Sequence, residues 1–427
     1  MMLDAVQYFR QKLYVKRVRE MKKILYFIKK ETVLSIAIVL AVISAFFVVP
    51  DREYISYIDF RTLAILFCLM SIVAGLRNIG VFDKLAERLL AKVRGIGEVT
   101  VILVCLCFFM SMFITNDVSL ITFVPFTIIL MKKLNPDADG RWMLKVIVMQ
   151  TIAANLGSML TPVGNPQNLY LYGKADISVV EFLKIMLPYT VCAFALLMVW
   201  IGLASMVRKR KLSHDGKPEM EKNKGLESRK DESIQKRQTS LSDASDSKLV
   251  HEKPERVEKL IVYLILFVIS LLAVSHILPY GVPFALVVLY LLLRDRKILT
   301  QVDYSLLCIF IALFIFIGNL GRIPAFSHML SNILTGREVV TSVIASQVMS
   351  NVPAAILLSG FTDHIRELVI GTNLGGLGTL IASMASLISF KYVAKEDRSF
   401  RGRYFLEFTV ANVIFLLIML ALYYLLS

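Results

Sequence analysis

The chain alternates long apolar runs with short polar or basic segments. A helix of roughly 20 residues crosses a hydrocarbon core of about 30 Å, so the longer runs predict transmembrane helices. Uninterrupted spans are expected at 31–49, 60–76, 182–206, 259–278, 282–293, 304–320 and 404–426. Together with two interrupted helices, they indicate an all-α polytopic membrane protein with about nine transmembrane helices.

Two further apolar runs have a short polar group at their centre. The first, 99–132, contains TND at 115–117 and has basic residues at both ends. A single crossing would place one basic end outside, whereas a helical hairpin that enters and returns keeps both ends inside. We therefore expect a re-entrant hairpin at 99–132, and a second at 338–360 with SN at 350–351 as its tip.

Two other apolar segments contain residues that interrupt a helix. The segment 141–172 includes TPVGNPQN, and the segment 365–390 includes NLGGLGTLIASMAS. Prolines and closely spaced glycines do not fit a continuous helix. Each segment is predicted to be a helix broken within the membrane.

The charged residues provide topology signals. The formal net charge is +15, and the basic residues cluster beside apolar runs, as expected of cytoplasmic flanks and not of a nucleic-acid surface. Residues 1–30 form a basic amphipathic segment expected on the inner membrane surface, which places the N-terminus in the cytoplasm. The polar stretch 207–258 is expected to be a disordered cytoplasmic loop. The chain should therefore lie in the plasma membrane, which is the cytoplasmic membrane in bacteria.

Two blocks of the first half align without gaps on blocks of the second half. Residues 58–85 lie on 302–329, and residues 155–169 lie on 373–387. The polar hairpin tips lie between these blocks in both halves. An internal repeat is therefore predicted.

Counting spans from a cytoplasmic N-terminus gives the two halves opposite orientations. Asp59 is expected outside, whereas the matching Asp303 is expected inside, beside a basic cluster. The sequence thus predicts two inverted repeats, 31–206 and 259–427. Inverted repeats with broken helices are typical of secondary transporters, whose sites lie near the membrane midplane.

Asp117 is the carboxylate at the centre of the first hairpin. A carboxylate within the membrane is expected to be functional, and it could bind Na⁺ or carry a proton. The alternative is a helix N-cap, which aspartate also forms well. The two roles are compatible.

No catalytic motif is evident. Membrane-protease motifs such as H-E-x-x-H are absent, and the five cysteines lie in apolar runs without metal-ligand spacing. We expect no enzyme activity and no cofactor.

The motifs FITNDVSLITFVPF and TIAANLGSMLTPVGNPQNLYLY resemble those of the ion transporter superfamily, which includes divalent-anion/sodium symporters, citrate permeases and arsenite permeases. The likeness is to the bacterial anion-permease branch, close to its citrate-transporter-like and arsenite-permease-like domain. It covers roughly residues 31–427 apart from the central loop.

The resemblance implies that hairpin tips and helix breaks together bind substrate and Na⁺. It further implies a homodimer and an elevator-like movement. From the tip and break chemistry together with the resemblance, the candidate substrate- and ion-binding residues are Thr115, Asn116, Asp117, Gly164, Asn165, Pro166, Asn168, Ser350, Asn351, Gly378, Thr379, Ala382 and Ser383, with Na⁺ expected near Asn116, Asp117 and Asn351.

The tips depart from the dicarboxylate-transporter pattern at two positions. Asp117 and Val352 stand where that pattern has threonines. An acid at the tip disfavours a directly bound dicarboxylate, since two like charges would share a poorly solvated site. The Asn-Asp tip also resembles that of arsenite permeases.

The leading hypothesis is secondary active transport of a small anion, coupled to Na⁺ or H⁺. The anion could be a carboxylate such as citrate or a dicarboxylate, or an inorganic oxyanion. Alternatives are sodium/proton antiport through Asp117 and efflux of arsenite or antimonite. A more remote one is a non-transporting scaffold that uses the 207–258 loop.

Overall fold

The computed structural model describes residues 31–90, 95–134, 140–214 and 254–427, together with residues 21 and 28. These residues form helices and connecting turns, with no strand among them. The helices of the first half are α2 (Thr32–Phe47), α3 (Glu53–Ser56), α4 (Phe60–Asn78), α5 (Val81–Leu90), α6 (Ile96–Ile114), α7 (Asn116–Leu134), α8 (Arg141–Ser158), α9 (Pro166–Ala175) and α10 (Val179–His214).

The second half begins with two apolar helices and continues through a short 3₁₀ helix. Its elements are α12 (Pro254–Val274), α13 (Gly281–Arg294), η1 (Arg296–Gln301), α14 (Tyr304–Gly321), α15 (Pro324–Leu334), α16 (Glu338–Met349), α17 (Asn351–Leu358), α18 (Ile365–Gly375), α19 (Met384–Glu396) and α20 (Phe400–Leu426).

Six of the described helices are long and apolar enough to cross a membrane: Phe60–Asn78, Ile96–Ile114, Val179–Arg208, Glu255–Val274, Tyr304–Gly321 and Phe400–Leu426. Three shorter apolar helices, α2, α13 and α16, accompany them. The predicted fold class, an all-α polytopic membrane protein, is confirmed.

Helices extend into both ends of the polar loop predicted at 207–258. Helix α10 continues to His214, and α12 begins at Pro254. Lysine and arginine are good helix formers and are favoured near helix C-termini, which explains why the basic run after residue 207 extends α10. Proline fits the first turn of a helix, where its missing N–H is not needed. The rest of the loop, and the N-terminal segment 1–30 apart from Met21 and Ile28, lie outside the described residues.

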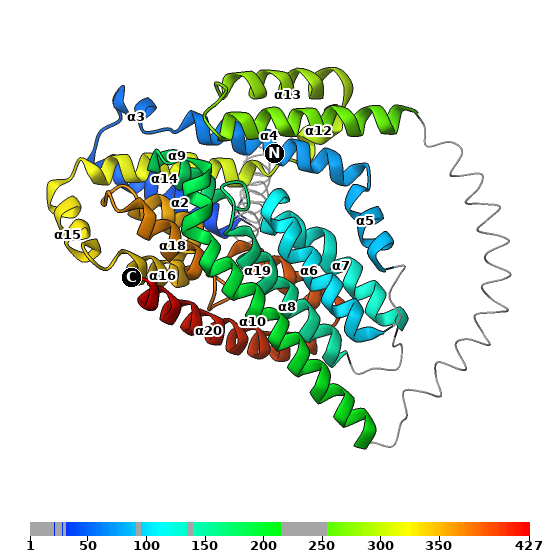
Figure 1. The fold of residues 1–427 in the computed structure, drawn as a ribbon. Coiled ribbons are helices and arrows are strands. Elements are labelled where there is room, and N and C mark those ends of the chain that lie inside the picture. The colour runs from blue at the N-terminus through cyan, green and yellow to red at the C-terminus, as the bar shows by residue number, and fades with distance from the viewer. Residues whose placement is uncertain (1–20, 22–27, 29–30, 91–94, 135–139, 215–253) are drawn as a thin grey trace, which may run out of the picture.

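The helices form two groups (Figure 1). In one group α2 packs on α14, and α12 and α13 pack on α4. The other contains the two hairpins and the broken helices, with α10 and α20 against α8. The groups meet where α9 contacts α4 and where α17 contacts α14.

Within the second group the two halves interlock. The first arm of each hairpin packs on the first arm of the broken helix of its own half, α6 on α8 and α16 on α18. The second arms cross to the other half, so that α7 packs on α19 and α17 packs on α9. Each hairpin therefore lies between broken helices of both halves.

The aligned aspartates have the same role in both halves. Asp59 caps α4 with φ −79° and ψ 86°, and its carboxylate accepts from the N–H of Thr62 at 2.9 Å. Asp303 caps α14 with φ −79° and ψ 83°, and accepts from the N–H of Leu306 at 3.1 Å. The repeated sequence thus forms the same helix start twice.

Candidate functional site

The two hairpins turn through the same unusual backbone conformation. Thr115 has φ 70° and ψ 153°, and Ser350 has φ 76° and ψ 155°. Residues other than glycine rarely adopt this region, and such strain persists only where the surroundings impose it. The shared conformation ends one helix and starts the next in each hairpin.

Each tip is bound to the break of its own half through the backbone. The N–H of Asn116 donates to the carbonyl of Gly164 at 3.1 Å, and the N–H of Asn351 donates to the carbonyl of Ala382 at 2.9 Å. Both asparagines are 5% exposed. The gapless alignment of the breaks places Gly164 on Ala382, so the two bonds are equivalent.

Asparagines satisfy the polar groups freed by the first break. Asn165 caps α9, and its side chain accepts from the N–H of Asn168 at 2.9 Å. The amide of Asn168 donates to the carbonyls of Ser158, Met159 and Thr161 at 3.4, 3.2 and 3.1 Å. Pro166 occupies the first turn of α9. The GNPQN sequence therefore supplies partners that hydrocarbon could not.

At the second break, a residue of the neighbouring hairpin bonds the backbone groups that the break leaves free. Gln347 in α16 donates to the carbonyls of Gly375 and Leu377 at 3.0 and 2.9 Å. Its Oε1 accepts from the N–H of Thr379 at 2.9 Å, and Gly378 there has φ +106°. Thr379 is thus bound to Gln347, and Gly378 lies against the Gln347 side chain. Neither residue makes a described bond to a tip asparagine, and Thr379 is exposed.

One buried asparagine on the first arm of each broken helix crosses to the other half. Oδ1 of Asn155 accepts from Oγ of Ser383 at 3.1 Å, and its Nδ2 donates to Oγ of Ser386 at 3.1 Å. Asn155 also accepts from Nδ2 of Asn116 at 3.1 Å. Ser383, at the second break, is thereby joined to the first hairpin tip.

Asn373 repeats this crossing in the opposite direction. Its Oδ1 accepts from Nδ2 of Asn165 at 3.1 Å, and its Nδ2 donates to Oδ1 of Asn168 at 2.6 Å. The alignment that places Asn155 on Asn373 also places Asn165 and Asn168 on the two serines bound by Asn155. The crossings are therefore matched residue by residue.

The carboxylate of Asp117 lies in the first turn of α7. Its Oδ1 is buried and has no hydrogen-bond partner among the described residues, and the backbone N–H of Asp117 donates to Oδ1 of Asn116 at 3.0 Å. No side-chain cap by Asp117 is present in the described structure, so the capping alternative has no bond to support it. A buried carboxylate oxygen calls for a proton or a cation.

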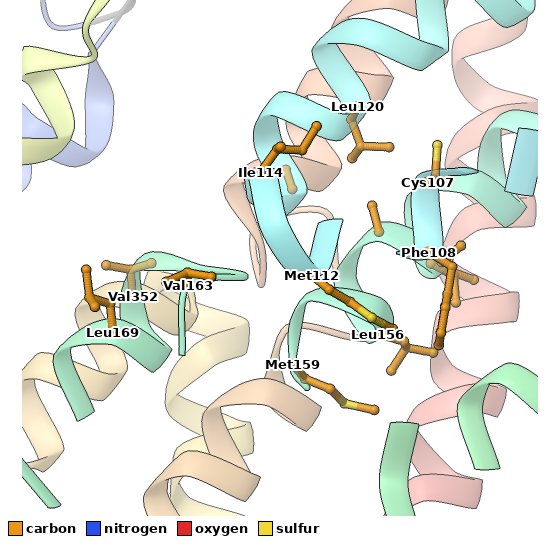
Figure 2. Close-up of a cluster of buried hydrophobic side chains, with 14 of the residues drawn as sticks. Cys107, Phe108, Met112, Ile114, Leu120, Leu156, Met159, Val163, Leu169 and Val352 are labelled. Carbon is orange, nitrogen blue, oxygen red and sulfur yellow. The ribbon is translucent and has the colours of Figure 1, made fainter. Parts of the chain in front are cut away.

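Buried apolar side chains lie next to the tips and breaks along the chain (Figure 2). Val352, which follows the second tip, lies in the same buried cluster as Val163 and Leu169 of the first break. Ile114 and Leu120 flank the first tip. The buried polar residues, among them Asn116, Asn155 and Asn351, therefore lie in a region of low dielectric, where hydrogen bonds are strengthened.

The sequence interpretation did not include Asn155, Asn373, Gln347 or Ser386 among the candidates. A signal for the first two existed, since they are identical residues at matching positions of the aligned NLGSMLT and NLGGLGT blocks. Gln347 and Ser386 gave no such signal, because methionine and asparagine occupy their matching positions, Met112 and Asn168.

Comparison with known proteins agrees with this architecture. Residues 24–365 match the family described as citrate transporter. An uncharacterized transporter of Methanocaldococcus jannaschii is 29% identical over 91% of this chain and 95% of its own. The inner membrane protein YbiR of Escherichia coli is 28% identical over 86% of this chain and 89% of its own.

A shorter similarity points to a plant protein. The silicon efflux transporter LSI3 of rice is 34% identical over 35% of this chain and 29% of its own length. The family match extends over most of the chain, including both hairpin tips. The chain belongs to the citrate transporter family and is a multi-pass membrane transporter of the anion-permease type.

Proposed function

We propose that this transporter moves a small anion by secondary active transport coupled to Na⁺ or H⁺, with the solute held between the two hairpin tips and the two helix breaks. Asn116 and Asn351 are the central ligands in this proposal. The solute class includes citrate, dicarboxylates and inorganic oxyanions.

The observation that carries the proposal is the buried, unpartnered Oδ1 of Asp117 beside the Asn116 tip. Among the described residues, none of the tip and break side chains has lysine or arginine as a hydrogen-bond partner. The site contains neutral amides and hydroxyls and one carboxylate, Asp117. An anion that enters it needs a cation or a proton to balance the charge. Ion coupling follows from that balance.

Oxygen atoms suitable for a small cation are present at the tips and at the breaks. The Oδ1 atoms of Asn116 and Asn351, the Asp117 carboxylate and the carbonyls at the breaks are all hard ligands. Unwound backbone and helix ends coordinate Na⁺ in this way in other transporters. We place the coupling ion beside Asn116, Asp117 and Asn351.

The arrangement in two helix groups supports an elevator-like movement. The group containing the hairpins touches the α4 and α14 group through α9 and α17, and α5, which follows α4, contacts α6. In this proposal the hairpin group moves as a unit against the other, within a homodimer.

Counterflow in proteoliposomes tests the proposal. Vesicles preloaded with citrate, succinate, phosphate or arsenate would take up the same labelled solute, and uptake would require Na⁺ or an inward pH gradient. Equal rates in vesicles lacking protein would overturn it. A thermal-stability screen against the same solutes, with and without Na⁺, identifies the ligand, because a bound ligand stabilises the folded state.

A second candidate is efflux of an uncharged hydroxylated solute such as arsenite or antimonite. The Asp117 carboxylate favours it, because an acid at the tip does not repel a neutral solute. The partial similarity to a silicon efflux transporter is in keeping with it. Metalloid sensitivity of cells lacking the gene, reversed by re-expression, would support this alternative over the anion proposal.

Two further readings are tested by simple experiments. Sodium/proton antiport through Asp117 would give a sodium-driven pH signal in vesicles without any added solute. A scaffold that uses the 207–258 loop as its partner-binding element would lose its function when residues 216–252 are deleted, whereas a transporter would retain flux.

A further inference from the structure

The two crossing asparagines differ in one respect. Asn155 binds the second break and also the side chain of Asn116 at the first tip. Asn373 binds the first break, and its remaining bond goes to the carbonyl of Val369 in its own helix at 2.7 Å. The second tip stays within its own half, because Oδ1 of Asn351 accepts from Oγ of Ser350 at 3.4 Å. Within the described part of the chain, only the first tip is connected to the opposite half through side chains, by way of Asn155.

A single atom of Asn155 connects the first tip to the second break. Its Oδ1 accepts from both Asn116 and Ser383, which uses both lone pairs of an amide oxygen. The group is buried, at 6% exposure, so water does not readily replace a lost donor. Asn116 and Ser383 therefore donate to the same oxygen. A shift of the Asn116 amide would move the Asn155 side chain and change the hydrogen bond that Ser383 donates to it.

Ser383 is connected in turn to the second tip. Its chain neighbour Ala382 accepts from the N–H of Asn351 at 2.9 Å. A continuous path thus runs from Asn116 through Asn155 and Ser383 to Asn351. All of these residues are buried.

We propose that Asn155 is a positioning residue that couples occupancy of the first hairpin tip to the geometry of the second break and tip. The inference rests on the proposed function, in which Asn116 contacts the transported solute or ion. When that contact forms, Asn155 fixes the loop that carries Ser383, so the two halves of the site assemble together.

A double-mutant cycle in the full-length protein, without any ligand, tests the coupling. Asn116→Ala, Ser383→Ala and their combination are compared by thermal midpoint in lipid nanodiscs. In the native background the combined loss is expected to differ from the sum by about 2 °C or more, since both residues share Asn155. With Asn155→Ala the losses become additive. Additive losses in the native background would overturn the inference.

Asn155→Ser provides a second background if the alanine variant does not fold, because serine remains polar but is too short to reach all three partners. Thr151→Val is the matched control. Thr151 lies one turn earlier on α8 and also crosses to α19, through a 2.8 Å bond to Ser389, but it does not touch a tip. Thr151→Val is expected to lower the melting temperature and to preserve the non-additivity of the cycle.

Flux measurements separate positioning from a merely structural role. With labelled citrate as probe and arsenite as the second probe, Asn155→Ser is expected to raise the half-saturating Na⁺ or H⁺ concentration about threefold or more. Thr151→Val is expected to change only the maximal rate, through the amount of folded protein. An unchanged half-saturating concentration in Asn155→Ser would overturn the positioning role.

The double-mutant cycle and the flux measurements also distinguish the coupling through Asn155 from transport itself. A non-additive cycle in a protein that moves neither probe, and no other solute of the screen, would support the structural coupling and overturn the proposed transport. Flux with an additive cycle would leave transport standing and overturn the coupling.

Discussion

The side-chain amide of Asn116 donates a 3.1 Å hydrogen bond to Oδ1 of Asn155, which places the tip of a helical hairpin in contact with the end of a broken helix. The same Asn155 oxygen also accepts from Ser383 of the opposite half. A site built in this way depends on residues of both halves at once. Substitutions at its polar and glycine positions should therefore have distinguishable effects.

Replacing Asp117 by asparagine should abolish transport or uncouple it from the ion. The amide keeps the shape but removes the buried negative charge that calls for a cation or proton. We expect ion-dependent uptake of the identified solute into proteoliposomes to fall roughly tenfold or more, the effect of losing about 1.4 kcal/mol. Asp83→Asn, at an exposed site on α5, is the matched control. Unchanged ion dependence in Asp117→Asn would exclude a coupling role.

Gly157 is expected to tolerate no side chain. A Cβ at this position would meet the carbonyl of Phe108 and the hydroxyl of Ser111, both on the neighbouring helix α6. Gly157→Ala should lower the free energy of unfolding by about 1–3 kcal/mol, the usual effect of overpacking. Gly202→Ala is the control, because a Cβ there meets nothing within 4 Å. Equal melting temperatures for the two variants would contradict the close approach of α6 and α8.

The two capping aspartates should be equally important for stability. Removing the cap by Asp59→Ala or Asp303→Ala should cost about 0.5–2 kcal/mol each, whereas asparagine at either position retains a capping oxygen and should cost less. Thermal midpoints of the four variants provide the measurement. A loss confined to one half would show that the repeated cap is not energetically equivalent.

His276 should make stability depend on pH. It lies in the loop between α12 and α13. Desolvation is the main cause that lowers the pKa of the imidazole below its ordinary value, and the positive charge of the neighbouring Arg61 lowers it further. Asp176 has a smaller effect in the opposite direction. In the unfolded chain the ring protonates near pH 6.5, about its ordinary value. The unfolded state then binds more protons, so stability should fall as pH drops through about 6.5 and level off below the folded-state pKa.

The measurement for His276 is the thermal midpoint between about pH 5 and 8. His276→Asn should flatten the profile in this range, and asparagine accepts the positive φ of 61° found there better than most residues. His328→Asn, which changes an exposed histidine elsewhere in the chain, is the matched control. A profile unaffected by His276→Asn would exclude this histidine as its source.

The sequence by itself predicted an all-α membrane protein and the positions at which its apolar helices are interrupted. Apolar run length, basic flanks and helix-breaking residues act locally, so the polar interruptions at Asn116 and Asn351 and the GNPQN break were readable in advance. The alignment of Asp59 with Asp303 was readable for the same reason, since a helix cap depends on a few neighbouring residues.

The tertiary structure alone decided which polar groups meet. Asn155 and Ser386 are 231 residues apart, and no local rule pairs them. Their contact follows from the interlocking of the second hairpin arms with the opposite broken helices, α7 on α19 and α17 on α9. The tertiary structure also determines which side chains bond the free carbonyls at the breaks. Gln347 of the second hairpin bonds those of the second break, whereas Asn168, in the first turn of α9, bonds those of the first. Buried polar groups must find partners, but the packing of distant helices determines which partners are within reach.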